Sequence, residues 1–148
     1  MITVRQATSD DAQIVFDLIM GLAQHEGSAD YILTSPEKMR QDGFGTDGHW
    51  GALIAENDGT PVGFLSFVWT YAIWAGERVM NIDDLFVHEN QRGKKIGEKL
   101  MFAAKELCKN QQVKRLRWEV EADNLGAIRF YERLGATVTT KGCCRWEV

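Results

Sequence analysis

The sequence predicts a mixed α/β fold, in which a central sheet carries helices on its faces. Short runs of β-branched and aromatic residues alternate with longer segments whose apolar residues recur at helical spacing. Turn residues at 57–61 (NDGTP) join two of the strand-like runs into an antiparallel hairpin. Between Val79 and Val120 a strand, a helix and another strand follow one another, which is the order of a right-handed crossover between parallel strands. Hairpins and a crossover together predict a mixed sheet.

The composition is typical of a folded protein with one domain, which we expect to span residues 1–148. The hydrophobic fraction is 45% and the aromatic fraction 10%. No apolar segment approaches the about 20 residues that cross a bilayer, and the start does not resemble a signal peptide, so we expect a cytoplasmic protein without a membrane partner. The net charge of −4 favours a cationic partner over nucleic acid. Three cysteines, an odd number, argue against a disulfide framework.

The first half of the chain predicts a strand at 2–7, two helices and a hairpin. Asp10 or Asp11 caps the first helix, and a second, shorter helix runs from Ser35 to near Gly43, with proline in its first turn. The hairpin strands cover 50–56 and 62–71. The apolar positions that predict the first helix are Ile14, Val15, Leu18, Ile19 and Leu22.

The second half predicts the crossover and a second strand–helix pair. A strand at 79–87 leads into a helix whose apolar residues are Ile96, Leu100, Ala103, Ala104 and Leu107. A strand at 116–120 and a last helix from Asn124 to near Gly135 follow, and two short strands at 137–140 and 144–148 close the chain. The crossover places the start of its helix at the carboxyl end of strand 79–87. Anionic ligands bind in such places.

The turn QRGKKIG at 91–97 puts Arg92, Lys94 and Lys95 around this helix N-terminus. The cluster is locally unfavourable, because the N–H groups at a helix start already make the potential positive. A bound pyrophosphate would remove the conflict by accepting hydrogen bonds from these groups, and the two glycines would let it approach closely. The alternative is a solvated basic turn. The spacing matches neither a P-loop nor a GxGxxG motif.

This turn resembles the pyrophosphate-binding motif Q/R-x-x-G-x-G/A of the GNAT superfamily of acetyltransferases, with Lys95 standing where glycine is usual. The preceding strand NIDDLFV and the segment N-x-x-A-x-x-F-Y-x-x-x-G-A, from Asn124 to Ala136, show the order and spacing of that superfamily. Four further features resemble its spermidine/spermine (diamine) and thialysine N-acetyltransferase branch: LAQHE at 22–26, DGFG at 42–45, DDLFV at 83–87 and Trp146. The resemblance implies a mostly antiparallel sheet, helices on both faces and a parallel strand pair splayed at the cofactor site.

The resemblance implies an acetyl-CoA-dependent N-acetyltransferase that acts by direct attack in a ternary complex. The acceptor would be a primary amine of a small cationic molecule, such as a polyamine, a diamine or a lysine analogue. An acetyltransferase for protein amines or an aminoglycoside, and a non-catalytic acyl-CoA-binding module, stay open as alternatives. A homodimer is implied as well. No metal is expected, because the histidines are scattered and the pair Cys143–Cys144 lacks the spacing of a zinc site.

The resemblance assigns proton transfer to two side chains. Tyr131, in the Phe-Tyr pair of the last helix, would protonate the departing thiolate; the alternative is an amphipathic tyrosine that packs its ring. Asp83 would take the ammonium proton through an ordered water, with Asp84 as its rival. Adjacent residues of a regular strand face opposite sides, so only one should reach the cleft unless a bulge turns both inward.

Cofactor contacts are implied for the strand, the turn and the last helix. Pantetheine would add to the sheet along Leu85, Phe86 and Val87, with the Phe86 N–H as the oxyanion donor. Asn124 would either bind pantetheine or cap its helix. The remaining implied cofactor positions are Arg92, Gly93, Lys94, Lys95, Ile96, Gly97, Glu98, Ala127 and Arg133.

Acceptor recognition is assigned to carboxylates and aromatic faces, which suit an ammonium ion. Trp74 and Trp146 would flank the entrance; taken alone, without the resemblance, each acceptor residue is better explained as an ordinary surface or packing residue. His25 stands where the polyamine branch has an aromatic residue, which would fit a different amine. The implied acceptor positions are His25, Glu26, Asp83, Asp84, Trp118 and Glu119.

Overall fold

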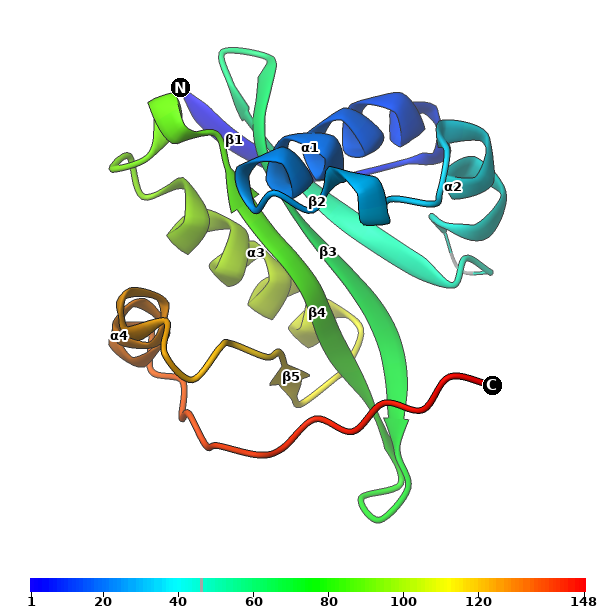
Figure 1. Cartoon of the computed structure of the whole chain (residues 1–148), viewed down its shortest axis with the longest axis vertical. Coiled ribbons are helices and arrows are strands. Elements are labelled where there is room, and N and C mark those ends of the chain that lie inside the picture. The colour runs from blue at the N-terminus through cyan, green and yellow to red at the C-terminus, as the bar shows by residue number, and fades with distance from the viewer. Residues whose placement is uncertain (46) are drawn as a thin grey trace. The chain divides into compact units, whose positions relative to one another are not determined.

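The computed structural model describes residues 1–45 and 47–148, which group into two compact units, Met1–Trp118 and Glu119–Val148. The first unit holds a five-stranded sheet whose strands follow chain order (Figure 1). Its strands are β1 (Ile2–Gln6), β2 (Trp50–Asn57), β3 (Thr60–Ala72), β4 (Glu77–Val87) and β5 (Leu116–Arg117). Strands β1 to β4 pair antiparallel, and β5 runs parallel to β4. The predicted mixed α/β fold is therefore confirmed.

Two helices cover one face of this sheet and a third covers the other (Figure 1). Helix α1 (Ala12–His25) and helix α2 (Pro36–Asp42) share a core with alternate residues of the strands, among them Ile54, Phe64 and Phe86. Full burial of such a side chain contributes roughly 1.5–3 kcal/mol. The predicted start of α2 is confirmed, because the Ser35 hydroxyl accepts a hydrogen bond from the Lys38 N–H at 3.1 Å.

Helix α3 (Ile96–Asn110) covers the opposite face and completes the crossover from β4 to β5. Its buried residues recur at helical spacing, as the sequence predicts, and Cys108 Sγ lies 3.8 Å from Met80 Sδ on β4. The crossover places the N-terminus of α3 beyond the carboxyl end of β4. Within the described residues, no helix combines the length and the apolar character that crossing a membrane requires.

The second unit contains one helix, α4 (Leu125–Arg133), and an extended tail. The Asn124 side chain caps α4 by accepting a hydrogen bond from the Ala127 N–H at 3.2 Å. Two predictions are wrong here: residues 137–140 and 144–148 form no strands, and the strand predicted at 116–120 is only Leu116–Arg117. A β-branched run such as TVTT suits a pleated surface, but a strand also needs a partner for its ladder, and the described part of this unit offers none. One domain over the whole chain stays a prediction.

Candidate active site

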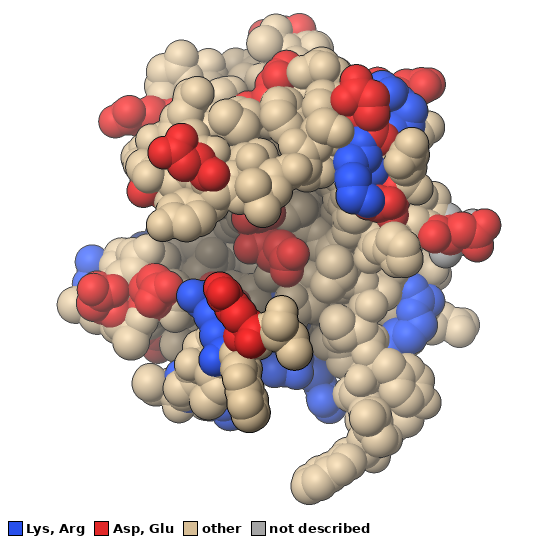
Figure 2. All heavy atoms as spheres, turned by 45° about the vertical axis from the view of Figure 1, so that its right-hand side comes forward, with Lys and Arg blue, Asp and Glu red and all other residues tan. Residues whose placement is uncertain are grey.

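A cavity of about 250 Å³ opens on the side of the sheet that α1 and α2 cover. It is lined by Ile19, Thr34, Met39, Trp50, Ser66, Phe67, Asp83 and Asp84. Two carboxylates therefore sit among apolar and hydroxyl side chains, and none of the lining residues is a lysine, arginine or histidine. Figure 2 shows acidic side chains inside a hollow on the face that it draws. This combination suits a cation attached to an apolar chain.

A β-bulge in β4 brings both carboxylates to this cavity. Ser66 pairs with Asp84 and Phe67 pairs with Ile82, so Asp83 is an extra residue without an opposite partner on β3. A bulge bends its strand and re-aims neighbouring side chains. Sequence alone left open whether one or both acids face the cleft; the structure lines the cavity with both.

The two acids have different surroundings. Asp83 is exposed and accepts a hydrogen bond from Asn81 Nδ2 at 3.3 Å. Asp84 is half-buried and accepts a hydrogen bond from the Ser66 hydroxyl at 2.5 Å. Burial raises the pKa of Asp84 above its ordinary value, the Ser66 hydrogen bond opposes this effect, and the charges of Asp83 and Glu26 add to it.

The carboxyl end of α1 contributes to the charge around this site. Glu26 caps α1, and its carboxylate is one of the charges that raise the pKa of Asp84. The neighbouring His25 Nε2 lies 3.4 Å from Nη2 of Arg92, whose Nε donates to the Val87 carbonyl at 3.2 Å. The structure thus brings a predicted acceptor residue into contact with a predicted cofactor residue, which the sequence did not predict.

The second half of β4 has one open edge. Strand β5 pairs with β4 only at Met80 and Asn81, so among the described residues no strand adjoins β4 on that side from Ile82 onward. Backbone groups that face this side have no strand partner among the described residues, which is the arrangement that a ligand extending the sheet would use, as pantetheine is predicted to do.

The direction of the backbone corrects one prediction about this edge. In an antiparallel pair, alternate residues point their N–H and C=O groups to the same neighbour. The His88 N–H donates to Val62 of β3 at 2.9 Å, and Phe86 has the same parity opposite Phe64. The Phe86 N–H therefore faces β3 and not the open edge, so it is wrong as the oxyanion donor. The backbone N–H and C=O groups of Leu85 and Val87 face the open edge instead. The Val87 carbonyl, for example, accepts its hydrogen bond from Arg92 and not from β3.

The start of α3 fits a diphosphate. The N–H groups of Ile96, Gly97 and Glu98 occupy the first helical turn, where the helix supplies them with no acceptor. Gly93 has a φ of +79° with open space around it, so an anion can approach its backbone closely. Lys95 has a φ of +59° at the N-cap, the left-handed region in which glycine is unstrained. This conformation is the physical reason for the glycine of the family motif.

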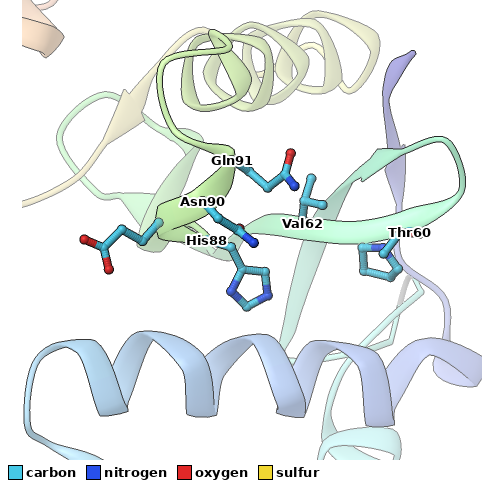
Figure 3. Close-up of a pocket in the computed structure, with 7 residues that line it drawn as sticks. Thr60, Val62, His88, Asn90 and Gln91 are labelled. Atoms are coloured by element: carbon cyan, nitrogen blue, oxygen red, sulfur yellow. The ribbon is translucent and has the colours of Figure 1, made fainter.

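A second hollow, of about 680 Å³, lies beside the loop that leads to Arg92 (Figure 3). Its lining residues are Thr60, Pro61, Val62, His88, Glu89, Asn90 and Gln91, none of which lines the smaller cavity. The Gln91 side-chain oxygen already accepts hydrogen bonds from Lys94 and Asn57. This larger hollow lacks the paired carboxylates that line the smaller cavity.

The remaining predicted residues belong to the boundary and the second unit. Trp118 is half-buried and Glu119 exposed, where the two units meet in the chain. Tyr131 lies in α4 with its ring 5.2 Å from that of Phe130, and burial raises the pKa of its phenol. Ala127 lies in the first turn of α4 and Arg133 at its end. That these residues meet Asp83 across a cofactor stays a prediction.

Sequence reasoning misplaced one residue and missed others. Trp74 is fully exposed in the turn between β3 and β4, and six residue steps of about 3.3 Å each lead from Glu77, where β4 begins, to Asp83. Trp74 therefore does not flank this cavity within the chain. Ser66 was missed, although a single polar residue inside the apolar run GFLSFVW is a usable signal. The lining residues from α1, α2 and β2 could be found only by folding the chain.

Residues 17–136 match the acetyltransferase (GNAT) family, and the chain belongs to that family. It is 29% identical to thialysine N-epsilon-acetyltransferase of Bos taurus, over 99% of this chain and 92% of that one. It is 28% identical to the human spermidine/spermine N(1)-acetyltransferase-like protein 1, over 90% of this chain and 20% of that one. The predicted branch is confirmed, and the protein is an acetyltransferase of a family that depends on acetyl-CoA.

The fold matches solved acetyltransferase structures as well. An aminoglycoside acetyltransferase, HMB0005, from an uncultured soil metagenomic sample superposes with a TM-score of 0.87 over 100% of this chain and 99% of that one, at 18% identity. An identity this low establishes the shared fold alone. Within the described residues, no group of three or more His, Cys, Asp or Glu side chains could hold a metal ion.

Proposed function

We propose that this protein transfers the acetyl group of acetyl-CoA to a primary amine of a small cationic acceptor, such as a polyamine, a diamine or a lysine analogue. The pair of carboxylates at the β4 bulge carries the proposal. Asp83 and Asp84 line one narrow cavity that has no basic lining residue, beside a strand with an open edge. Uncompensated negative charge in a confined site attracts ammonium ions and disfavours neutral or anionic acceptors.

Acetyl-CoA would supply the acetyl group as an activated thioester. The N–H groups of the first turn of α3 would bind its diphosphate, and Arg92 and Lys94 would add positive charge. The outward backbone groups of Leu85 and Val87 would bind pantetheine, and we assign the oxyanion hydrogen bond to the Leu85 N–H in place of Phe86. Lys95 has a left-handed backbone conformation, which costs about 1–2 kcal/mol for a residue other than glycine. We therefore expect Lys95 to keep this conformation only while α3 is folded.

Asp83 and Tyr131 would each carry out one of the two proton transfers. A lysine-like amine has a pKa of about 10 and is protonated at neutral pH, so a base must take its proton before attack. Asp83 is exposed and would pass this proton to solvent through a water, whereas Asp84 would hold the second ammonium group of the acceptor, the one that does not react. Tyr131 would donate its phenolic proton to the leaving sulfur, and the raised pKa keeps that proton in place at neutral pH.

Similarity to thialysine and polyamine acetyltransferases supports an aliphatic amine as the acceptor. A cavity of about 250 Å³ accommodates a narrow chain better than a ring system, since pockets for drug-sized ligands are typically about 300–1,000 Å³. A protein amine or an aminoglycoside is the second candidate, because solved neighbours with the same fold include aminoglycoside acetyltransferases. A cytoplasmic location and a homodimer belong to the proposal.

An acceptor panel tests this function. Purified protein is mixed with acetyl-CoA and with diamines, lysine, thialysine, spermidine, monoamines of matched length, an aminoglycoside and a lysine peptide, and release of the CoA thiol is followed. We expect the highest kcat/KM for a diamine or lysine analogue and at least a tenfold lower value for its matched monoamine, the effect of one ion pair of about 1.4 kcal/mol. Absence of thiol release with every amine would leave only an acyl-CoA-binding module.

A further inference from the structure

Ser66 is a buried polar residue whose burial needs a reason. It is 6% exposed in the middle of β3, and the buried polar or charged side chains of the described chain are Ser66 and Asp11. Asp11 is accounted for by its ion pair with Arg5. A buried hydroxyl costs free energy unless it is hydrogen-bonded, and the Ser66 hydroxyl donates to Oδ2 of Asp84 at 2.5 Å. The hydrogen bond to Asp84 therefore offsets the cost of burying this hydroxyl.

The register explains how a side chain as short as serine reaches this carboxylate. Ser66 lies directly opposite Asp84 in the ladder, next to the bulge at Asp83. Opposite residues of an antiparallel pair have Cβ atoms about 4.5–5.5 Å apart, so a serine hydroxyl spans the gap. Ser66 engages Oδ2 and leaves Oδ1 as the second oxygen of this carboxylate.

We propose that Ser66 is a positioning residue for the acceptor: its hydroxyl orients the Asp84 carboxylate so that the second oxygen binds the acceptor ammonium ion. The inference rests on the proposed function, because it takes the cavity at the β4 bulge as the acceptor site. Ser66 acts through Asp84 and has no part in the proton transfers themselves.

The charges around Asp84 show why an oriented hydroxyl is needed. Asp83 on the same strand and Glu26 at the end of α1 both act on Asp84 and disfavour its ionised form, and burial disfavours it more. The lining residues from α1, α2 and β2 are neutral. The hydrogen bond from Ser66 favours the carboxylate and opposes these effects. Without it, the pKa of Asp84 is raised further, so at a given pH a smaller fraction of Asp84 is the anion that attracts an ammonium ion.

Two variants of equal shape isolate the hydroxyl. Ser66→Thr keeps it and adds a methyl group, whereas Ser66→Val has the same branched shape and lacks it. A change in cavity shape affects both variants equally. We expect Ser66→Val to have a KM for the best amine about tenfold above that of Ser66→Thr at neutral pH, with kcat and the KM for acetyl-CoA unchanged, since a hydrogen bond to a charged group contributes about that factor. The difference in KM should grow as the pH falls.

A second measurement does not depend on catalysis. With carbon-13 at the aspartate carboxyl positions, the Asp84 resonance is assigned by its loss in Asp84→Asn and followed against pH. Its titration midpoint should lie at higher pH in Ser66→Val than in Ser66→Thr. Ser66→Ala replaces Ser66→Val if the latter does not fold.

The outcomes separate this inference from the proposed function. Equal midpoints and equal amine KM values in the matched variants would overturn the positioning role, even if the protein acetylates amines. If the panel finds no acceptor, the proposed function fails, and binding of the diamine 1,4-diaminobutane followed by calorimetry takes the place of KM. Equal affinities of the Thr and Val variants would then refute the role, and weaker binding by the Val variant would support it.

Discussion

Asp83 and Asp84 are adjacent in the chain, yet exposure gives them different chemistry. Asp83 faces solvent and can exchange a proton with water, whereas Asp84 is half-buried beside Ser66 and within the field of two other carboxylates. In the proposed function this difference makes Asp83 the proton-transferring and Asp84 the charge-holding carboxylate, since environment commonly separates the roles of two acids. Keeping Asp84 ionised costs free energy in the folded protein, because burial and the neighbouring carboxylates disfavour its charge.

This cost predicts that Asp84→Asn stabilises the fold at neutral pH. The pKa of Asp84 is raised in the folded state, so the folded protein binds its proton more tightly than the unfolded chain does, and the free energy of unfolding falls as pH rises above the ordinary pKa of 3.8. We expect Asp84→Asn to gain on the order of 1 kcal/mol at pH 7.5 and little near pH 4. Urea unfolding at both pH values measures this, with the exposed Asp83→Asn as the control. A loss of stability at pH 7.5 would contradict it.

Tyr131→Phe tests the proton donor. Removing the phenolic hydroxyl should lower kcat by about 10²-fold and leave the Kd for acetyl-CoA unchanged, because a proton donor acts in the transition state. Since burial raises the pKa of Tyr131, the wild-type rate should show no loss from ionisation of this phenol near pH 9. Steady-state kinetics and calorimetry measure both quantities. Unchanged turnover would remove Tyr131 from the mechanism.

Among the elements, the N-terminus of α3 has a locally destabilising composition that a bound anion would relieve. Lys94 and Lys95 lie next to N–H groups that already carry partial positive charge, and only Glu98 offsets them in the first turn. The crossover between β4 and β5 keeps this helix start beyond the strand whose edge is open. An elongated ligand with an anionic group, as acetyl-CoA is in the proposed function, would use both the turn and the edge.

Gly97→Asp separates ligand binding from helix stability at this element. A carboxylate in the first turn of α3 should stabilise the helix by about 0.3–1 kcal/mol through the macrodipole, yet repel the diphosphate. We expect thermal stability to be kept or raised while the Kd for coenzyme A increases at least 100-fold. Gly97→Ala is the matched control, because it adds a side chain without charge. Wild-type affinity in Gly97→Asp would refute the placement of the diphosphate.

For the molecule as a whole, stability at low pH depends on an ion pair that joins β1 to the residues before α1. Arg5 donates to both carboxylate oxygens of Asp11 at 2.9 Å and to Glu56 at 2.9 Å. The Asp11 side chain is only 10% exposed, and hydrogen bonds from Arg5 chiefly lower its pKa to about 2. Because this pKa is depressed, the pair stabilises the fold above pH 4 and loses its effect as pH falls toward 2.

Asp11→Asn should therefore destabilise the protein by about 2 kcal/mol at pH 7, the equivalent of the difference between a pKa of 3.8 and one of about 2. The difference from wild type should shrink at pH 2. Urea titrations at the two pH values measure it, and Asp10→Asn, one residue earlier and exposed, is the control. A difference that does not depend on pH would show that the ion pair is not its source.

Local sequence determined most of the elements and the chemistry of the anion site. Helical spacing of apolar residues, a proline after a serine cap and the NDGTP turn act over a few residues, so α1, α2, α3 and the β2–β3 hairpin were predictable. The cationic turn before α3 was also visible, because its conflict with the helix dipole is local. The strands predicted at 137–140 and 144–148 failed because a strand depends on a distant partner, which no local pattern supplies.

Only the tertiary structure decided which residues meet. Sequence named Asp83 and Asp84, but the bulge that aims both into one cavity follows from the pairing of β4 with β3. The same pairing turns the Phe86 N–H inward and leaves Leu85 and Val87 at the open edge, and it sets Ser66 against Asp84. Register is a property of two strands brought together over a long stretch of chain, and a shift of one residue reverses every side chain. For that reason the sequence by itself determined the chemical groups, and the folded sheet decided their directions.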